Sequence, residues 1–139
     1  MNSIFEKTDI LVGDIQHLDK IQPVIPFKDE VIEFLSELSK KILFDKDAKE
    51  YADVISFGFW CRKSNINKLS VEHLNTYNRI GLGLVFHITP TNVPVNFAFS
   101  YAFSLLAGNS NIVRVPSSNF KQVEIICRII NNVFSKQKF

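Results

Sequence analysis

Residues 81–117, GLGLVFHITPTNVPVNFAFSYAFSLLAGNSNIVRVPS, decide the fold of this chain. Leu82–Ile88 is a nearly continuous apolar run bounded by glycine and proline, which is typical of a parallel strand buried on both faces. Residues 94–107 have the length and spacing of a helix, with a proline in the first turn and Gly108 at the left-handed position after the end. Asn111–Val115 is a second apolar run. The stretch therefore predicts a strand–helix–strand unit.

Helical patterns flank this unit on both sides. After it, Ser117 or Ser118 is expected to cap a helix over residues 119–135. Before it, apolar residues at helical spacing predict helices over residues 29–43, 47–61 and 71–78. The side chains expected to face inward in the second of these are Tyr51, Val54, Ile55 and Phe59. Ser70 is the expected N-cap of the third, and Ile10–Val12 are expected to form an edge strand or small hairpin.

The order of elements, helices followed by β-α-β-α, is the start of a doubly wound parallel sheet. The sequence thus predicts an α/β fold in which an N-terminal strand and helical region, residues 1–80, precedes the first units of a Rossmann-like sheet, residues 81–139. The two regions are expected to form one structural unit, because 139 residues are the length of a single domain.

Composition narrows the function classes. The net charge of +2, with lysine and glutamate mixed along the chain, makes no case for nucleic acid, and no uncharged run that reaches 18 residues has the character of a membrane span. Cys61 and Cys127 lack the spacing of a zinc site or a disulfide framework, and the three histidines are too scattered to indicate a metal. Both thiols are expected to lie in the core of a protein in the reducing cytosol, which predicts a cytoplasmic location.

The candidate site is the pair of turns that follow the two predicted strands, Thr89–Val93 and Pro116–Ser118, because ligands of open α/β sheets bind beyond the carboxyl ends of the strands. Asn92 has two readings. Its carboxamide either caps the following helix or donates a hydrogen bond to a carbonyl oxygen that gains charge during nucleophilic attack. Arg114 either reaches a cofactor phosphate or ribose or simply faces solvent at the edge of the sheet. His87, alone in a strand, has the pattern of a structural residue.

The same stretch resembles a known family. Its Pro-Thr-Asn-Val-Pro turn, the Ala-Gly-Asn after the helix and the Pro-Ser-Ser turn after the second strand are similar to the cofactor-domain core of the aldehyde dehydrogenase superfamily. More closely, the stretch resembles the acyl-CoA reductase family that includes the fatty-acid reductase of bacterial luminescence. The resemblance covers residues 81–117 at the level of motifs, and the helices before them fit only in general arrangement.

This resemblance assigns provisional roles to the site residues. It implies that Asn92 donates to an oxyanion, and that Thr89, Pro90 and Thr91 line the nicotinamide side of a dinucleotide crevice. Arg114 stands where dehydrogenases usually carry a lysine that contacts the adenosine ribose. Ser117 stands where many members that prefer NAD carry a glutamate. Loss of that carboxylate next to an arginine favours a 2′-phosphate, so the implied cofactor is NADP.

The resemblance also implies a chemistry that needs a cysteine thiolate to attack an acyl thioester, such as acyl-CoA, followed by reduction to the aldehyde. Neither Cys61 nor Cys127 lies in a position to do this. We therefore expect an N-terminal part of an NADP-dependent acyl-CoA reductase that is inactive alone and needs a second polypeptide. The alternatives are a truncated remnant or a non-catalytic α/β interaction module whose incomplete sheet is covered by a partner chain or by self-association.

Overall fold

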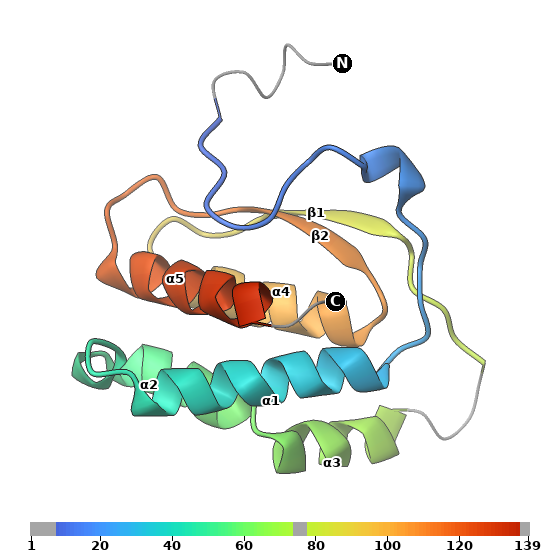
Figure 1. Ribbon diagram of the computed structural model, residues 1–139, viewed down its shortest axis with the longest axis horizontal. Helices are drawn as coiled ribbons and strands as arrows, with labels where there is room; N and C mark the ends of the chain where they lie inside the picture. Colours follow the sequence, from blue (N-terminus) through green and yellow to red (C-terminus); the bar gives the residue numbers. More distant parts are fainter. Residues whose placement is uncertain (1–7, 74–77, 137–139) are drawn as a thin grey trace.

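The computed structural model describes residues 8–73 and 78–136 of the chain, and Figure 1 shows their arrangement. Helices come first and a β-α-β-α series follows, so the predicted α/β class is confirmed. Short 3₁₀ turns lie at Leu18–Lys20 and Ala48–Glu50. The helices and strands are α1 (Asp29–Phe44), α2 (Ala52–Trp60), α3 (Lys63–His73), β1 (Leu84–Ile88), α4 (Asn96–Leu106), β2 (Ser110–Arg114) and α5 (Lys121–Lys136).

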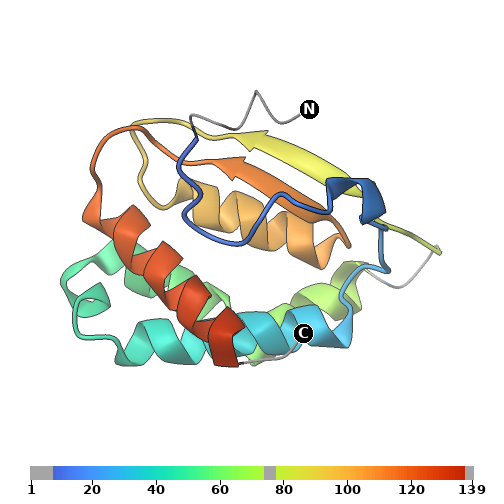
Figure 2. The same ribbon diagram turned by 45° about the horizontal axis from the view of Figure 1, so that its top comes forward.

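The two strands pair in parallel, in a register that runs from Leu84 opposite Ser110 to Ile88 opposite Arg114. Helices α4 and α5 cover one face of this pair, and α1 and α2 lie on the far side of α4 and α5 (Figures 1 and 2). Helices after successive parallel strands fall on one face in this way because the crossover connection is right-handed. The arrangement is that of the first units of a Rossmann-like sheet.

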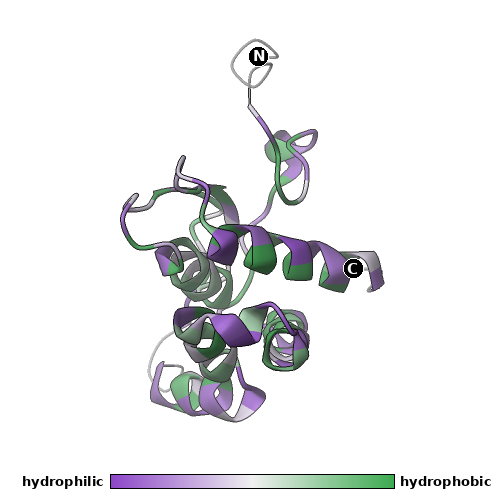
Figure 3. Ribbon diagram, turned by 90° about the vertical axis from the view of Figure 1, so that its left-hand side faces the viewer, coloured by the Kyte–Doolittle hydropathy of each residue, from purple (hydrophilic) through white to green (hydrophobic). Residues whose placement is uncertain are grey.

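A single core joins the helices to the β-α-β-α series. Buried side chains of α1 and α2 belong to the same cluster as those of α4 and α5, and α1 contacts both α4 and α5. Figure 3 shows α5, which leads to the C-terminus, with hydrophobic residues on the side that faces the helices beneath it. The apolar residues of α5 at helical spacing are all buried: Val123, Ile126, Ile129, Ile130 and Val133. Among the described residues, no helix has both the length and the apolar content that crossing a membrane requires.

The expectation that β1 is buried on both faces is wrong. Val85 and His87 point toward the helices and are half-buried, whereas Leu84, Phe86 and Ile88 alternate with them and are 41%, 58% and 71% exposed. Successive side chains of a strand point to opposite faces, so these three apolar residues form one outer face of the sheet. The described part of the chain leaves that outer face open to solvent.

The predicted second helix differs from the structure at its start and in its buried face. Helix α2 begins at Ala52 instead of residue 47, because the Asp45 side chain accepts a hydrogen bond from the Ala48 N–H and holds a 3₁₀ turn there. Phe59 was expected to be buried but is 47% exposed. The buried position is taken by Gly58, where a Cβ atom would lie 2.7 Å from Ile42 Cγ2. This glycine therefore permits the close approach of α1 and α2.

Two further expectations fail in the N-terminal half. The third helix covers Lys63–His73 and not residues 71–78, so Ser70 lies inside the helix; residues 74–77 of the expected span are outside the described residues. Its polar sequence shows little periodicity, and it is anchored by the fully buried Ile66. Ile10–Val12 form no strand: the Leu11 carbonyl accepts a hydrogen bond from the Asn131 side chain of α5 instead.

Three backbone segments cross tightly at the beginning of the sheet. The Val24 N–H donates to the Gly108 carbonyl at 3.0 Å, and the Gly81 N–H donates to the Val24 carbonyl at 2.9 Å. Gly108 has a φ of 90°, which confirms the left-handed position predicted for it after α4. A side chain at Gly81 or Gly108 would enter this crossing, because a Cβ atom there would lie 2.1 Å from a backbone oxygen.

Candidate functional site

The two predicted turns lie side by side at the carboxyl edge of the strand pair, since Ile88 and Arg114 are partners in the register. Thr89 joins them directly. Its side chain is buried, and its hydroxyl donates a hydrogen bond of 3.0 Å to the carbonyl oxygen of Arg114. The Thr89 hydroxyl thus braces the end of β1 against the end of β2. Pro90 and Thr91, which follow it, are exposed at the same edge.

Asn92 does not cap a helix, so that reading of the sequence is wrong. Helix α4 begins at Asn96, and its N-cap position is Val95, which makes no side-chain capping bond. The turn closes instead through the Asn96 N–H, which donates to the Val93 carbonyl. Asn92 is exposed, and among the described residues we find no hydrogen bond to its carboxamide. Its two amide donors are therefore free to meet a ligand.

Arg114 ends β2 on the outer face of the sheet, the face that also carries Phe86 and Ile88. Its side chain is exposed, and no carboxylate of the described chain lies within ion-pairing distance of it. A guanidinium without a protein partner can form a bidentate pair with a phosphate. The structure is therefore compatible with either of the two readings of this arginine.

The second turn is anchored by Pro116, which is buried, and exposes Ser117 and Ser118. Helix α5 begins at Lys121, two residues later than predicted, because the Phe120 N–H first bonds to the Ser118 carbonyl. The serines therefore precede the helix instead of capping it. Both serine side chains face solvent at the edge where α4 and α5 begin, and two helix N-termini favour negative charge at that edge.

A polar network behind the turns involves His87, whose structural role the sequence suggested without its partners. Its Nδ1 lies 2.9 Å from the Ser100 hydroxyl of α4, and its Nε2 lies 2.8 Å from the Asn111 side-chain oxygen of β2. The Asn111 amide donates in turn to the Asn109 carbonyl. This network locks the register of both strands against α4. The sequence feature that could have indicated this network is the pair Ser100 and Ser104, two polar residues spaced four apart in a largely apolar helix.

Neither cysteine belongs to the turns. Cys61 follows α2 and Cys127 lies within α5, and both are buried free thiols, as the sequence predicted. Burial raises the pKa of the Cys61 thiol and raises the pKa of Cys127 to about 11. Both thiols are therefore protonated near neutral pH, where a nucleophilic cysteine must be a thiolate.

The exposed groups at the carboxyl edge have the chemistry to bind phosphate oxygens. The exposed groups are one guanidinium, hydroxyls from both turns and a carboxamide, and the N-termini of two helices lie beside them. Cations and hydroxyl donors of this kind bind phosphate oxygens, and a carboxamide can bind a carbonyl oxygen.

Comparison with known proteins identifies a family for this chain. A family model described as acyl-CoA reductase (LuxC) matches residues 62–137, which is more than half of the chain. The match extends from α3 to α5 and includes both turns. No curated protein and no solved structure matches the chain. The chain belongs to the LuxC family of acyl-CoA reductases.

Proposed function

We propose that the carboxyl edge of this chain binds NADPH and supplies one oxyanion donor, Asn92, to an acyl-CoA reductase that converts an acyl thioester to an aldehyde. The observation that carries the proposal is the family match, which includes both turns, together with the parallel register that puts the turns at one edge. The acyl-CoA substrate is the one that the family description names.

The proposed division of roles is the one that the resemblance to the reductase family implies. Arg114 pairs with the 2′-phosphate of the cofactor, and Ser117, three residues later, adds a hydroxyl in place of a carboxylate that would repel that phosphate. Pro90 and Thr91 line the nicotinamide side. Thr89 acts with them by holding the turn to β2 through its bond to the Arg114 carbonyl. When bound, NADPH supplies the hydride that reduces the acyl group.

Asn92 acts at the acyl carbonyl. When a cysteine thiolate attacks the carbonyl carbon of the thioester, the electron pair of the C=O bond moves onto oxygen. The exposed Asn92 amide donates a hydrogen bond to this oxygen as its charge grows. The electron pair then returns from oxygen to carbon, and the bond between this carbon and the coenzyme A sulfur breaks. Coenzyme A leaves as the thiolate, and the acyl group stays on the cysteine. In this proposal the nucleophile is a cysteine other than Cys61 and Cys127, because these two are buried, protonated thiols.

The outer face of the sheet favours a second candidate function. Leu84, Phe86 and Ile88 form a continuous apolar strip that is left in solvent. Exposed apolar strips of this kind mark contact surfaces. We propose that a second polypeptide, or a second copy of this chain, covers the strip. In the second candidate function the chain is an interaction module and takes no part in catalysis.

Changing Arg114 to glutamine tests the cofactor assignment. We expect the R114Q chain to bind NADPH about 10-fold or more weakly, because a charge-assisted phosphate contact contributes roughly 1.5–3 kcal/mol. Affinity for NADH, which lacks the 2′-phosphate, should fall much less. The measurement is calorimetric titration of the purified chain with each dinucleotide.

Arg62→Gln is the matched control, since Arg62 lies over the Phe59 ring, at 4.1 Å, after the end of α2. This variant should retain the affinity of the unmodified chain for NADPH. The assignment would be contradicted if NADPH and NADH lost affinity equally in R114Q, or if the unmodified chain showed no saturable binding of NADPH.

A further inference from the structure

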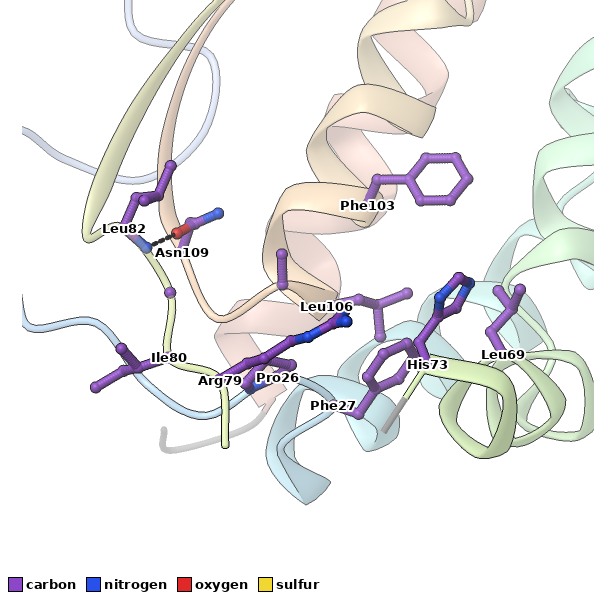
Figure 4. Close-up of a pocket in the computed structure, with 12 residues that line it drawn as sticks. Pro26, Phe27, Leu69, His73, Arg79, Ile80, Leu82, Phe103, Leu106 and Asn109 are labelled. Atoms are coloured by element: carbon purple, nitrogen blue, oxygen red, sulfur yellow. Dashed lines mark hydrogen bonds between the residues drawn. The ribbon is translucent and has the colours of Figure 1, made fainter. Parts of the chain in front are cut away.

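A pocket of about 340 Å³ lies at the opposite, amino edge of the strand pair, where β1 and β2 begin (Figure 4). The strands are five residues long, so this edge is about 16 Å from the turns at the carboxyl edge. We call this hollow the amino-edge pocket. Its walls come from residues 26–27 just before α1, the end of α3, residues 79–82, the end of α4 and Asn109.

We propose that the amino-edge pocket binds a small apolar monocarboxylate, with its hydrocarbon part inside and its carboxylate at Arg79 and His73. This site is separate from the cofactor edge, and the inference does not depend on the proposed reductase activity.

The interior of the pocket is apolar. Figure 4 shows Phe27, Leu69, Phe103 and Leu106 around one hollow, contributed by three separate segments. Phe103 is more than half exposed there, although it lies on an otherwise well-packed helix. A ligand that covers this surface gains roughly 25 cal/mol for each Å² of apolar area removed from water. The volume is at the low end of the range for small-molecule sites, which favours a small ligand.

The wall formed by Phe27 is held in an unusual conformation. Phe27 has a φ of 53°, in the left-handed region that non-glycine residues rarely adopt, and it is the one such residue in the described chain. Its N–H donates to the Leu106 carbonyl at 2.7 Å, and its ring stacks on His73 with centroids 6.5 Å apart. Strain of this kind, about 1–3 kcal/mol, collects at binding sites, where surrounding contacts maintain it.

The charged group that lines the pocket is the Arg79 guanidinium, and the His73 imidazole adds ring nitrogens beside it. No carboxylate belongs to the described lining, and no ion pair of Arg79 occurs within the described chain. The C-terminus of α4 would repel an anion if its carbonyls were free. They are not: the carbonyls of residues 103–106 each accept a backbone N–H. The rim therefore attracts an anionic head group, and the interior attracts a hydrocarbon.

Decanoate, kept below its micellar concentration, is a suitable probe. Trp60, the single tryptophan, lies 4.7 Å from the Phe103 ring between centroids, so its fluorescence reports on ligand that enters the pocket. We expect saturable quenching or enhancement with decanoate. Arg79→Gln should weaken binding about 10-fold, the effect of losing one charge-assisted contact. Ala107→Leu, at an exposed position on the lining, should fill the pocket and abolish binding.

Two controls separate a built site from general hydrophobic binding. Arg62 lies outside the pocket, so the Arg62→Gln variant should bind decanoate as the unmodified chain does. Decanol, which has the same chain without the charge, should bind at least about 10-fold more weakly. Equal affinity for decanol and decanoate, unchanged affinity in both R79Q and A107L, or no saturable binding by the unmodified chain would each overturn the proposal. Circular dichroism confirms that each variant is folded before titration.

Discussion

Gly108→Ala is expected to destabilise the fold by about 3 kcal/mol or more, because two costs act at one position. The backbone φ of 90° is strained for any side chain, at about 1–2 kcal/mol. A Cβ atom would also lie 2.1 Å from the Val24 carbonyl oxygen, so the backbone of Val24 must move. That movement breaks its bonds to Gly108 and Gly81, and each contributes about 1 kcal/mol.

Gly13→Ala separates the two costs. Gly13 also has a positive φ, 74°, but nothing lies within 4 Å of the position that its Cβ atom would occupy. This variant should lose only the strain cost, about 1–2 kcal/mol. Urea denaturation followed by circular dichroism gives both free energies of unfolding. Equal losses in G108A and G13A would show that the crossing of Val24 with Gly108 does not hold the sheet in place.

Asn92→Ala is expected to lower kcat for aldehyde formation about 10²–10³-fold, the effect of removing one oxyanion donor. The reaction contains this chain, a second polypeptide that carries the cysteine domain, acyl-CoA and NADPH. KM should change little, since the Asn92 amide acts mainly on charge that develops after binding. NADPH oxidation and aldehyde release are followed together.

Asn132→Ala is the control for this change, because Asn132 is an exposed asparagine on α5, outside both turns. Its kcat should stay within about 2-fold of the unmodified protein. An unchanged kcat in N92A would remove Asn92 from catalysis. Formation of a stable complex with no aldehyde, even with the unmodified chain, would favour the interaction module over the reductase.

The sequence was sufficient to predict the β-α-β-α order, because apolar runs, helical spacing and special turn residues all agreed. Gly108 illustrates this agreement: its place after an apolar helix predicted the left-handed conformation that the structure has. The parallel pairing followed from the same pattern and is confirmed. The turns could be placed at one edge for the same reason, although the sequence did not give the details of their hydrogen bonding.

Features that depend on distant contacts were not predictable. The strand Leu-Val-Phe-His-Ile carries apolar side chains on both of its faces. Periodicity therefore could not reveal that helices of the described chain cover only one face of the strand. The partners of His87 lie 13 and 24 residues away and are ordinary polar residues. The amino-edge pocket draws on separate parts of the chain, from Pro26 to Asn109, and no local motif marks it. Helix α3 was misplaced because one buried side chain, Ile66, fixes it.

The most direct test of the central claim, that NADPH lies across the two turns at the carboxyl edge, is amide mapping by NMR. The ¹⁵N-labelled chain is titrated with NADPH, and backbone shifts are followed along its length. The account predicts saturable shifts at Thr91–Val93 and Ser117–Asn119, with Leu82 and Asn109 at the other edge unchanged. Shifts centred on Leu82 and Asn109, or spread evenly with neither turn affected, would contradict it.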